Sequence, residues 1–396
     1  MDDYVIRVLT APSEVDAADW DKLLQSQASP TPFMRHAYLS ALFDSGCASR
    51  ATGWDLRIVM LEQDHALVAA AVVYLKDHSM GEYVFDWAWA NAYQQHGLDY
   101  YPKGVVAVPF TPVPGSRLLA RDTKARVALL QALVQFGQAW GLSSFHFLFT
   151  ADADVAAAKQ AGLLLRHTVQ FHWTNAAEGY TGFEAFLATL SQEKRKKIRQ
   201  ERRKVQEAGV TFRHALGATI SAEDWAFFYR CYERTYLEHG NAPYLTPDFF
   251  VRMAHAMPEN WLLFVAEREG RPIACSLIAV GPGEAPNGQD KPSQVAYGRY
   301  WGALERVDCL HFEACYYQPL EWCIAQGYQR FEGGAQGEHK MARALLPVKT
   351  TSIHWIAHPE FRRAIANFLN REEQGISNYM EALQSRSPLR ASPGKE

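Results

Sequence analysis

Residues Tyr328 to His358 read YQRFEGGAQGEHKMARALLPVKTTSIHWIAH. A short apolar run leads into a segment with three glycines, two glutamates, a histidine and two cations, and an alternating apolar run follows over 351–357. Glycine gives the backbone extra freedom and lets other groups approach closely. The pattern therefore predicts a strand, a polar glycine loop and a second strand. Such a loop is typical of binding sites, although a solvated surface loop has a similar composition.

Glu332 directly follows the first of these apolar runs. A carboxylate beside glycines and aromatic residues can lose part of its hydration, which raises its pKa towards the range of a general base. Glu338 or His339 could do the same work. Lys340 and Arg343 would then hold an anionic carboxylate or phosphate, the arginine as a fork and the lysine as a point charge.

An aromatic helix is predicted over 309–326, just before the glycine loop. It follows a strand over 295–301, so that both elements would face a substrate near the loop. A single histidine on a helix is more often a packing residue than a base, and we expect this of His311 taken alone. The side chains that we expect to contact the substrate are Arg299, Trp301, His311, Glu313, Tyr316, Gln336, Lys340, Arg343 and His354.

Working outwards, the two halves of the chain show the same order of elements: a strand, helices, a hairpin, a strand, a helix and two strands. This order predicts an α/β (α+β) fold with two copies of one domain, each a mixed central sheet flanked by helices. We expect domains at 1–178 and 179–384, the second including a basic helix at 191–209, and a disordered tail at 385–396.

The basic helix lies between the halves. Residues 191–204 read SQEKRKKIRQERRK, in which eight cations and two glutamates give a net charge of about +6, against −3 for the whole chain. Such an asymmetry favours a polyanionic ligand such as tRNA, a nucleotide-linked precursor or coenzyme A, while a solvated linker helix would look the same. The candidate donor-binding residues here are Arg195, Lys196 and Arg199.

A second anion-binding candidate is the segment 111–117, TPVPGSR, which lies between a strand and a helix of the first half. Its prolines lack N–H donors, so Arg117 and its neighbours would have to supply the contacts, and a rigid turn is the other interpretation. The chain contains no GxxxxGK[ST], HExxH or GxSxG motif. Nucleotide hydrolysis, zinc peptidase and serine hydrolase activities therefore lose their main support.

The composition is that of a soluble globular protein, with 396 residues of which 48% are hydrophobic and 21% charged. No apolar run is long enough to cross a membrane, and the N-terminus does not resemble a signal peptide. The six cysteines form no CxxC pair, which is typical of reduced thiols in a cytoplasmic protein. We expect neither a metal site nor a DNA partner.

Two segments, VVAVPFTPVPGSRLL at 105–119 and the stretch from HFEACYY to SIHW at 311–355, resemble a bacterial family of FemAB-like N-acyltransferases linked to peptidoglycan biosynthesis or recognition. The resemblance spans nearly the whole chain. It implies tandem acetyltransferase-like (GNAT) domains and transfer of an acyl or aminoacyl group to an amine, such as that of a peptidoglycan precursor or related peptide. The donor would be an acyl-CoA or an aminoacyl-tRNA.

Other features of that family match less well. In Fem-type ligases a basic helical arm projects from one domain, and 190–210 is similar to this arm but shorter. The [RQ]xxGx[GA] loop of acetyl-CoA enzymes is absent at 306–311 and at 111–117, and Ala344 stands where the family often has glycine. Two alternatives stay open: a non-catalytic binder of tRNA or an anionic cell-wall precursor, and an acyl-CoA-dependent enzyme acting on small molecules.

Overall fold

The computed structural model describes residues 4–283, 293–335 and 337–390 and divides into two compact units. Unit 1 comprises Met1–Thr168, Gly283–Pro292 and Lys349–Asn378, and unit 2 comprises Val169–Pro282, Ser293–Val348 and Tyr379–Glu396. The units differ from the predicted domains 1–178 and 179–384, because the strand and helix that follow Lys349 belong largely to unit 1. The predicted domains were two contiguous segments, whereas the chain returns to unit 1 at Lys349.

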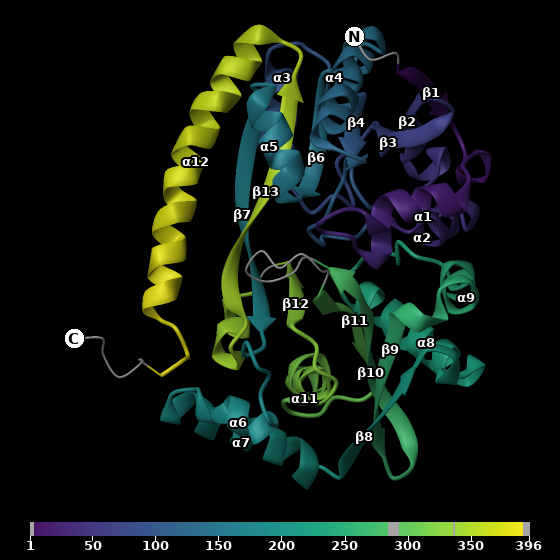
Figure 1. The fold of residues 1–396 in the computed structure, drawn as a ribbon. Coiled ribbons are helices and arrows are strands. Elements are labelled where there is room, and N and C mark those ends of the chain that lie inside the picture. The colour runs from purple at the N-terminus through teal and green to yellow at the C-terminus, as the bar shows by residue number, and fades with distance from the viewer. Residues whose placement is uncertain (1–3, 284–292, 336, 391–396) are drawn as a thin grey trace. The chain divides into compact units, whose positions relative to one another are not determined.

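Unit 1 is a mixed sheet flanked by helices, with strand order β1-β2-β3-β4-β6-β13 and the first part of β7 (Figure 1). Phe145 and Phe147 of β6 face the core beneath α4 and α5, whereas His146 between them faces Trp89 of α3. Its elements are β1 (Val5–Leu9), α1 (Ala17–Gln25), α2 (His36–Asp44), β2 (Asp55–Gln63), β3 (Ala66–Lys76), α3 (Trp87–Gln95), β4 (Lys103–Val106), β5 (Leu119–Ala120), α4 (Thr123–Ala139), β6 (Ser144–Thr150), α5 (Asp152–Gln160), most of β13 (Leu346–Ile356) and most of α12 (Pro359–Ser385).

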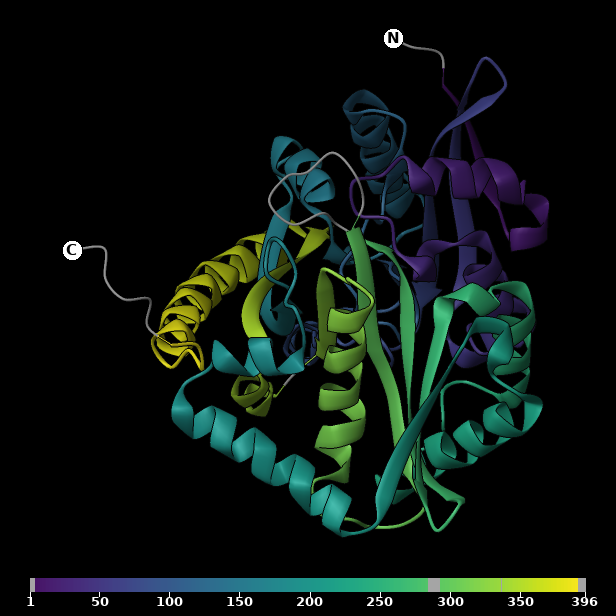
Figure 2. The same cartoon turned by 60° about the horizontal axis from the view of Figure 1, so that its bottom comes forward.

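Unit 2 contains the second part of β7 (Leu164–Thr174) and the strand order β7-β12-β11-β10-β9-β8. Its other elements are α6 (Phe183–Ala188), α7 (Gln192–Glu207), β8 (Val210–Leu216), α8 (Ala222–Glu238), α9 (Pro247–Ala256), β9 (Trp261–Arg268), β10 (Arg271–Gly283), β11 (Ser293–Ala303), α10 (Leu310–Phe312), a π-helical turn (Glu313–Tyr317), α11 (Gln318–Ala325), β12 (Arg330–Ala335) and a 3-10 segment (Glu338–Arg343). Helix α11 runs along one face of this sheet (Figure 2), where Leu320 packs with Ile278 and Ala296.

Helix α8 approaches β11 very closely. A Cβ atom at Gly302 would lie 2.1 Å from the backbone oxygen of Cys231, so the helix can pack here only against glycine. Since α8 covers one face of the sheet and α11 the other, the middle of β10 is buried. This rigid frame positions the strand ends that carry the candidate site.

Most predicted elements are confirmed, including both hairpins and the repeated order of elements. The aromatic segment 83–101 contains a helix, α3, that the sequence analysis did not predict. The predicted tail begins too early, because the backbone of Pro388 accepts from Ser191 and Arg390 donates to Thr189. Residues 391–396 lie outside the described part of the chain. Within the described residues, no helix has both the length and the apolar character that a membrane span requires.

Candidate functional site

The candidate site of unit 2 lies where two parallel strands separate. Strands β11 and β12 pair from Val295 with Arg330 to Tyr297 with Glu332, and β11 then continues to Ala303. Beside this divergence is a cavity of about 130 Å³. It is lined by Ser276, Ile278, Gly298, Arg299, Tyr300, Trp301, His311, Cys315, Tyr316, Phe331 and Gly333. Four predicted substrate contacts, Arg299, Trp301, His311 and Tyr316, are therefore brought together.

The helix above the cavity is irregular. The predicted helix 309–326 consists of α10, the π-helical turn Glu313–Tyr317 and α11. A π-helical turn inserts one extra residue and is frequent at functional sites, because it changes which side chains share a face. Here His311, Cys315 and Tyr316 all line the cavity.

His311 is the best-placed proton acceptor in the cavity. Burial lowers its pKa to about 4, and the nearby side chains of His339, Arg343 and Lys340 act in the same direction. The imidazole is therefore neutral at pH 7 and has a nitrogen that can accept a proton, but its low pKa makes it a weaker base than an exposed histidine. Its ring packs edge-on against Trp301, with the centroids 5.3 Å apart, and against Tyr316 at 5.7 Å.

Tyr316 connects the cavity with His339, a predicted catalytic residue. The Tyr316 hydroxyl lies 3.3 Å from His339 Nε2. Burial raises the pKa of Tyr316 and lowers that of His339. At neutral pH the phenol thus keeps its proton and can donate it to the neutral imidazole.

Lys340 and Arg343 are buried rather than presented to solvent. Lys340 Nζ donates to Gly334 O at 3.1 Å, and burial lowers the pKa of this lysine to about 8. Arg343 donates to His339 O at 2.7 Å and to Glu201 of α7 at 2.8 Å, and its guanidinium lies 3.5 Å from the centre of the Phe312 ring. The predicted anion contact through Arg343 is thus replaced by an internal ion pair.

The predicted carboxylates do not line the cavity. Glu332 is buried and pairs with Arg330 at 3.0 Å, on the face of β12 opposite to Phe331 and Gly333, which do line it. Glu338 accepts from Tyr379 at 2.8 Å at the surface. Glu313 accepts from Arg202 at 3.1 Å. Glu338 and Glu313 thus join neighbouring elements, whereas Glu332 and Arg330 lie on the same strand, and the position of these residues in the sequence did not reveal these pairs.

The basic helix α7 packs against unit 2 instead of projecting from it. Ile198, Glu201 and Val205 form its buried face, and Arg202 pairs with both Glu313 and Glu321. Of the other predicted donor contacts, Arg199 pairs with Glu184 at 2.5 Å. Arg195, Lys196 and Lys197 form no ion pair within the described part of the chain, so the available positive charge lies in the N-terminal half of the helix.

Two predicted site residues lie in unit 1 and are not among the residues that line the unit 2 cavity. Arg117 is 1% exposed and donates to Leu148 O at 2.9 Å and to Val113 O, so it cannot present its charge to a ligand. His354 is buried, and its Nδ1 atom lies 2.7 Å from His146 Nδ1. Gln336, also predicted to contact substrate, lies outside the described residues.

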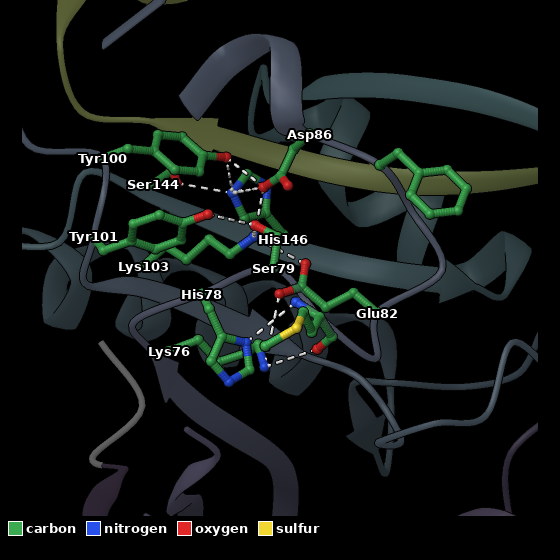
Figure 3. Close-up of polar contacts among 12 residues, drawn as sticks. Lys76, His78, Ser79, Glu82, Asp86, Tyr100, Tyr101, Lys103, Ser144 and His146 are labelled. Carbon is green, nitrogen blue, oxygen red and sulfur yellow. Dashed lines mark hydrogen bonds and ion pairs between the residues drawn. The ribbon is translucent and has the colours of Figure 1, made fainter. Parts of the chain in front are cut away.

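Unit 1 contains a buried ion network that the sequence analysis missed (Figure 3). The ammonium of Lys103 donates to Ser79 at 2.7 Å, to Glu82 at 2.9 Å and to Asp86 at 2.5 Å. Burial opposes the ionisation of both acids: it raises the pKa of Glu82 to about 7, whereas at Asp86 the nearby Lys103 overcomes it and lowers the pKa to about 2. A lysine beginning an apolar strand was the signal that could have revealed this network.

Each unit combines a mixed order of strands with flanking helices, which is the predicted α/β fold class. The sequence matches, over residues 11–391, the FemAB-like family described as acting in peptidoglycan biosynthesis or recognition, and the chain belongs to this family. No curated protein matches the sequence.

Solved structures with the same fold are distant in sequence. FemX is 9% identical, with a TM-score of 0.54 over 91% of this chain and 100% of FemX. The C-terminal domain of a protein described as a lysylphosphatidylglycerol synthetase from Agrobacterium fabrum is 11% identical, with a TM-score of 0.52 over 90% of this chain and 96% of that domain. A conserved protein of unknown function from Bacteroides thetaiotaomicron is 11% identical, with a TM-score of 0.50 over 88% of this chain and 99% of the other.

Proposed function

We propose that this protein is an N-acyltransferase that moves an acyl or aminoacyl group to the amine of a peptidoglycan precursor or related peptide. The family description and the fold shared with FemX support a transferase acting on such substrates. The observation that carries the proposal is the unit 2 cavity, where a neutral histidine faces the diverging edge of β11. The donor would be an acyl-CoA or an aminoacyl-tRNA.

In the proposed reaction, the acceptor amine attacks the acyl carbonyl carbon inside the cavity. His311 takes the proton that the amine loses and passes it to the leaving sulfur or oxygen when the thioester or ester bond breaks. Backbone N–H groups of β11 beyond Tyr297, which β12 no longer pairs, would stabilise the developing negative charge on the carbonyl oxygen. This assignment moves the general base from Glu332 to His311 and keeps His339 in a supporting role through Tyr316.

The anionic part of the donor would contact the cations of α7. Arg195, Lys196 and Lys197 supply charge that no described carboxylate neutralises, and the lysine Lys340 adds a buried positive charge near the cavity. A polyanion held by such side chains loses affinity steeply as salt increases, since bound counterions are released on binding. The same cations would serve a protein that binds tRNA without catalysis.

The test compares binding of acetyl-CoA and charged tRNA, and transfer from each, at two salt concentrations. We expect the variant with Arg195, Lys196 and Lys197 changed to alanine to lose donor affinity at low salt. A matched variant with Arg234, Arg252 and Arg271 changed to alanine removes the same charge from other surfaces of unit 2 and should bind normally. If the protein binds a donor but transfers no group from any donor, the proposal of an enzyme fails and that of a binding protein is supported.

A further inference from the structure

One carboxylate of the basic helix α7 is buried against the segments that carry the candidate site. Glu201 lies on the buried face of α7 and is 8% exposed. Its Oε2 atom accepts a hydrogen bond from the Tyr317 hydroxyl and, at 2.8 Å, another from the Arg343 guanidinium. A single oxygen atom therefore joins three segments of unit 2: α7, the π-helical turn and the 3-10 segment Glu338–Arg343.

The two segments that Glu201 joins to α7 meet each other at the cavity wall. Tyr316, next to Tyr317 in the π-helical turn, lines the cavity, and its hydroxyl lies 3.3 Å from His339 Nε2. Arg343 donates to His339 O at 2.7 Å, so the guanidinium that binds Glu201 also holds the backbone of that histidine. Both partners of the contact between Tyr316 and His339 are thus held by Glu201, one through its neighbour in sequence and the other through its backbone.

The surroundings of these contacts are tightly packed. A Cβ atom at Gly337, whose φ is +106°, would lie 2.5 Å from His339 Cε1, so the His339 ring occupies the space that any larger residue would need. The Arg343 guanidinium lies 3.5 Å from the centre of the Phe312 ring, just before the π-helical turn. Moving any of these groups would leave the buried ion pair of Arg343 and Glu201 without good geometry, which is costly.

We propose that Glu201 is a positioning residue for the transfer reaction: it holds Tyr316 and His339 at the cavity wall in the arrangement that the reaction needs. The inference rests on the proposed acyl transfer and adds a residue that acts through others, since Glu201 itself does not line the cavity. It connects the helix proposed to bind the donor with the cavity proposed to receive the acyl group. Small displacements of site groups can lower a reaction rate by up to about 100-fold.

Two glutamates in similar ion pairs provide a matched kinetic test. Glu201→Gln removes the charge that binds Arg343, and Glu372→Gln removes the charge that binds Arg166 of unit 1, in each case at 2.8 Å. With a peptidoglycan-precursor peptide as acceptor and acetyl-CoA or charged tRNA as donor, we expect Glu201→Gln to lower kcat per folded molecule at least about tenfold and to change the donor KM less than about twofold. Glu372→Gln should change neither constant. Normal kcat in Glu201→Gln would overturn the inference and leave the transferase standing.

Hydrogen–deuterium exchange of the protein alone tests the same contacts without a reaction. We expect exchange at 313–317 and 338–345 to become at least about fivefold faster in Glu201→Gln and to stay unchanged in Glu372→Gln. Unchanged exchange at both segments of Glu201→Gln would contradict the positioning role, whatever the kinetics. If no donor supports transfer by the unaltered protein, the proposed function fails and the inference falls with it.

Tyr317→Phe provides the test if Glu201→Gln does not fold. This change removes only the hydroxyl that donates to Glu201 and leaves the ion pair of Glu201 and Arg343 in place. We expect it to lower kcat by about two- to fivefold, again without a change in the donor KM, and to accelerate exchange at 313–317 more than at 338–345. Normal kcat together with normal exchange in this variant would overturn the inference.

Discussion

Each unit contains a pair of parallel strands, but the space beyond the paired residues differs between the units. In unit 1, β4 and β6 pair in parallel from Gly104 to Val106, and in unit 2, β11 and β12 pair in parallel from Val295 to Tyr297. Beyond these three pairs unit 2 has its cavity, whereas in unit 1 the segment 107–118 fills the corresponding place with buried side chains. We infer that the residues that follow the strand, β4 in unit 1 and β11 in unit 2, determine whether the space beside it is filled or forms a cavity.

Hydrogen bonds hold the filling segment of unit 1 in place. Gly115 donates to Phe149 O at 3.0 Å and accepts from Ala151 at 3.0 Å, which joins the segment to the end of β6. The Arg117 guanidinium then donates to the backbone oxygens of Leu148 and Val113. Arg117 is thus buried within unit 1, whereas His311 lines the cavity of unit 2.

The largest expected effect is on catalysis by unit 2. Changing His311 to Asn removes the proton acceptor and should lower kcat by about 100-fold or more, because general base catalysis contributes factors of this size. Initial rates with saturating donor measure it. The control His214→Asn changes an exposed histidine of the same unit and should keep the normal rate. Full activity without His311 would place the chemistry elsewhere.

The second prediction concerns the stability provided by unit 1. Lys103→Met removes the buried cation that contacts both Glu82 and Asp86 and should lower the free energy of unfolding by about 3 kcal/mol, as breaking a buried pair does. Urea denaturation measures this loss, while the rate per folded molecule should not change. Arg7→Met removes a surface pair with Glu62 and should cost less than about 1 kcal/mol. Similar losses in both variants would remove the distinction between buried and exposed pairs.

The smallest effect is a pH dependence specific to unit 2. Because burial lowers the pKa of Lys340 to about 8, its positive charge is present below this pH and is lost as the pH rises through it. The Kd for an anionic donor should therefore increase severalfold between pH 7 and pH 9. Lys340→Arg, whose charge persists at pH 9, should show a much weaker increase. An identical pH profile in this variant would mean that Lys340 does not contribute to donor binding.

The sequence was informative about elements and less so about sites. Apolar periodicity predicted nearly all strands and helices, and the repeat of their order predicted two units. It missed α3, since Trp and Tyr at positions 87–93 weaken a helical pattern. Four cavity residues were predicted because they lie near one strand end. The surroundings of Glu332 and Arg343 could not be read from the sequence: those of Glu332 depend on which face of β12 it occupies, and those of Arg343 depend on Glu201, which is distant in sequence.

The most direct test of the central claim is hydrogen–deuterium exchange of the full chain with and without butyryl-CoA. If the cavity of unit 2 receives the acyl group, exchange should slow at residues 298–303 and 310–317, which border it. The corresponding segments of unit 1, residues 103–118 and 144–150, should exchange at unchanged rates. Protection confined to these unit 1 segments would contradict the assignment of the site to unit 2.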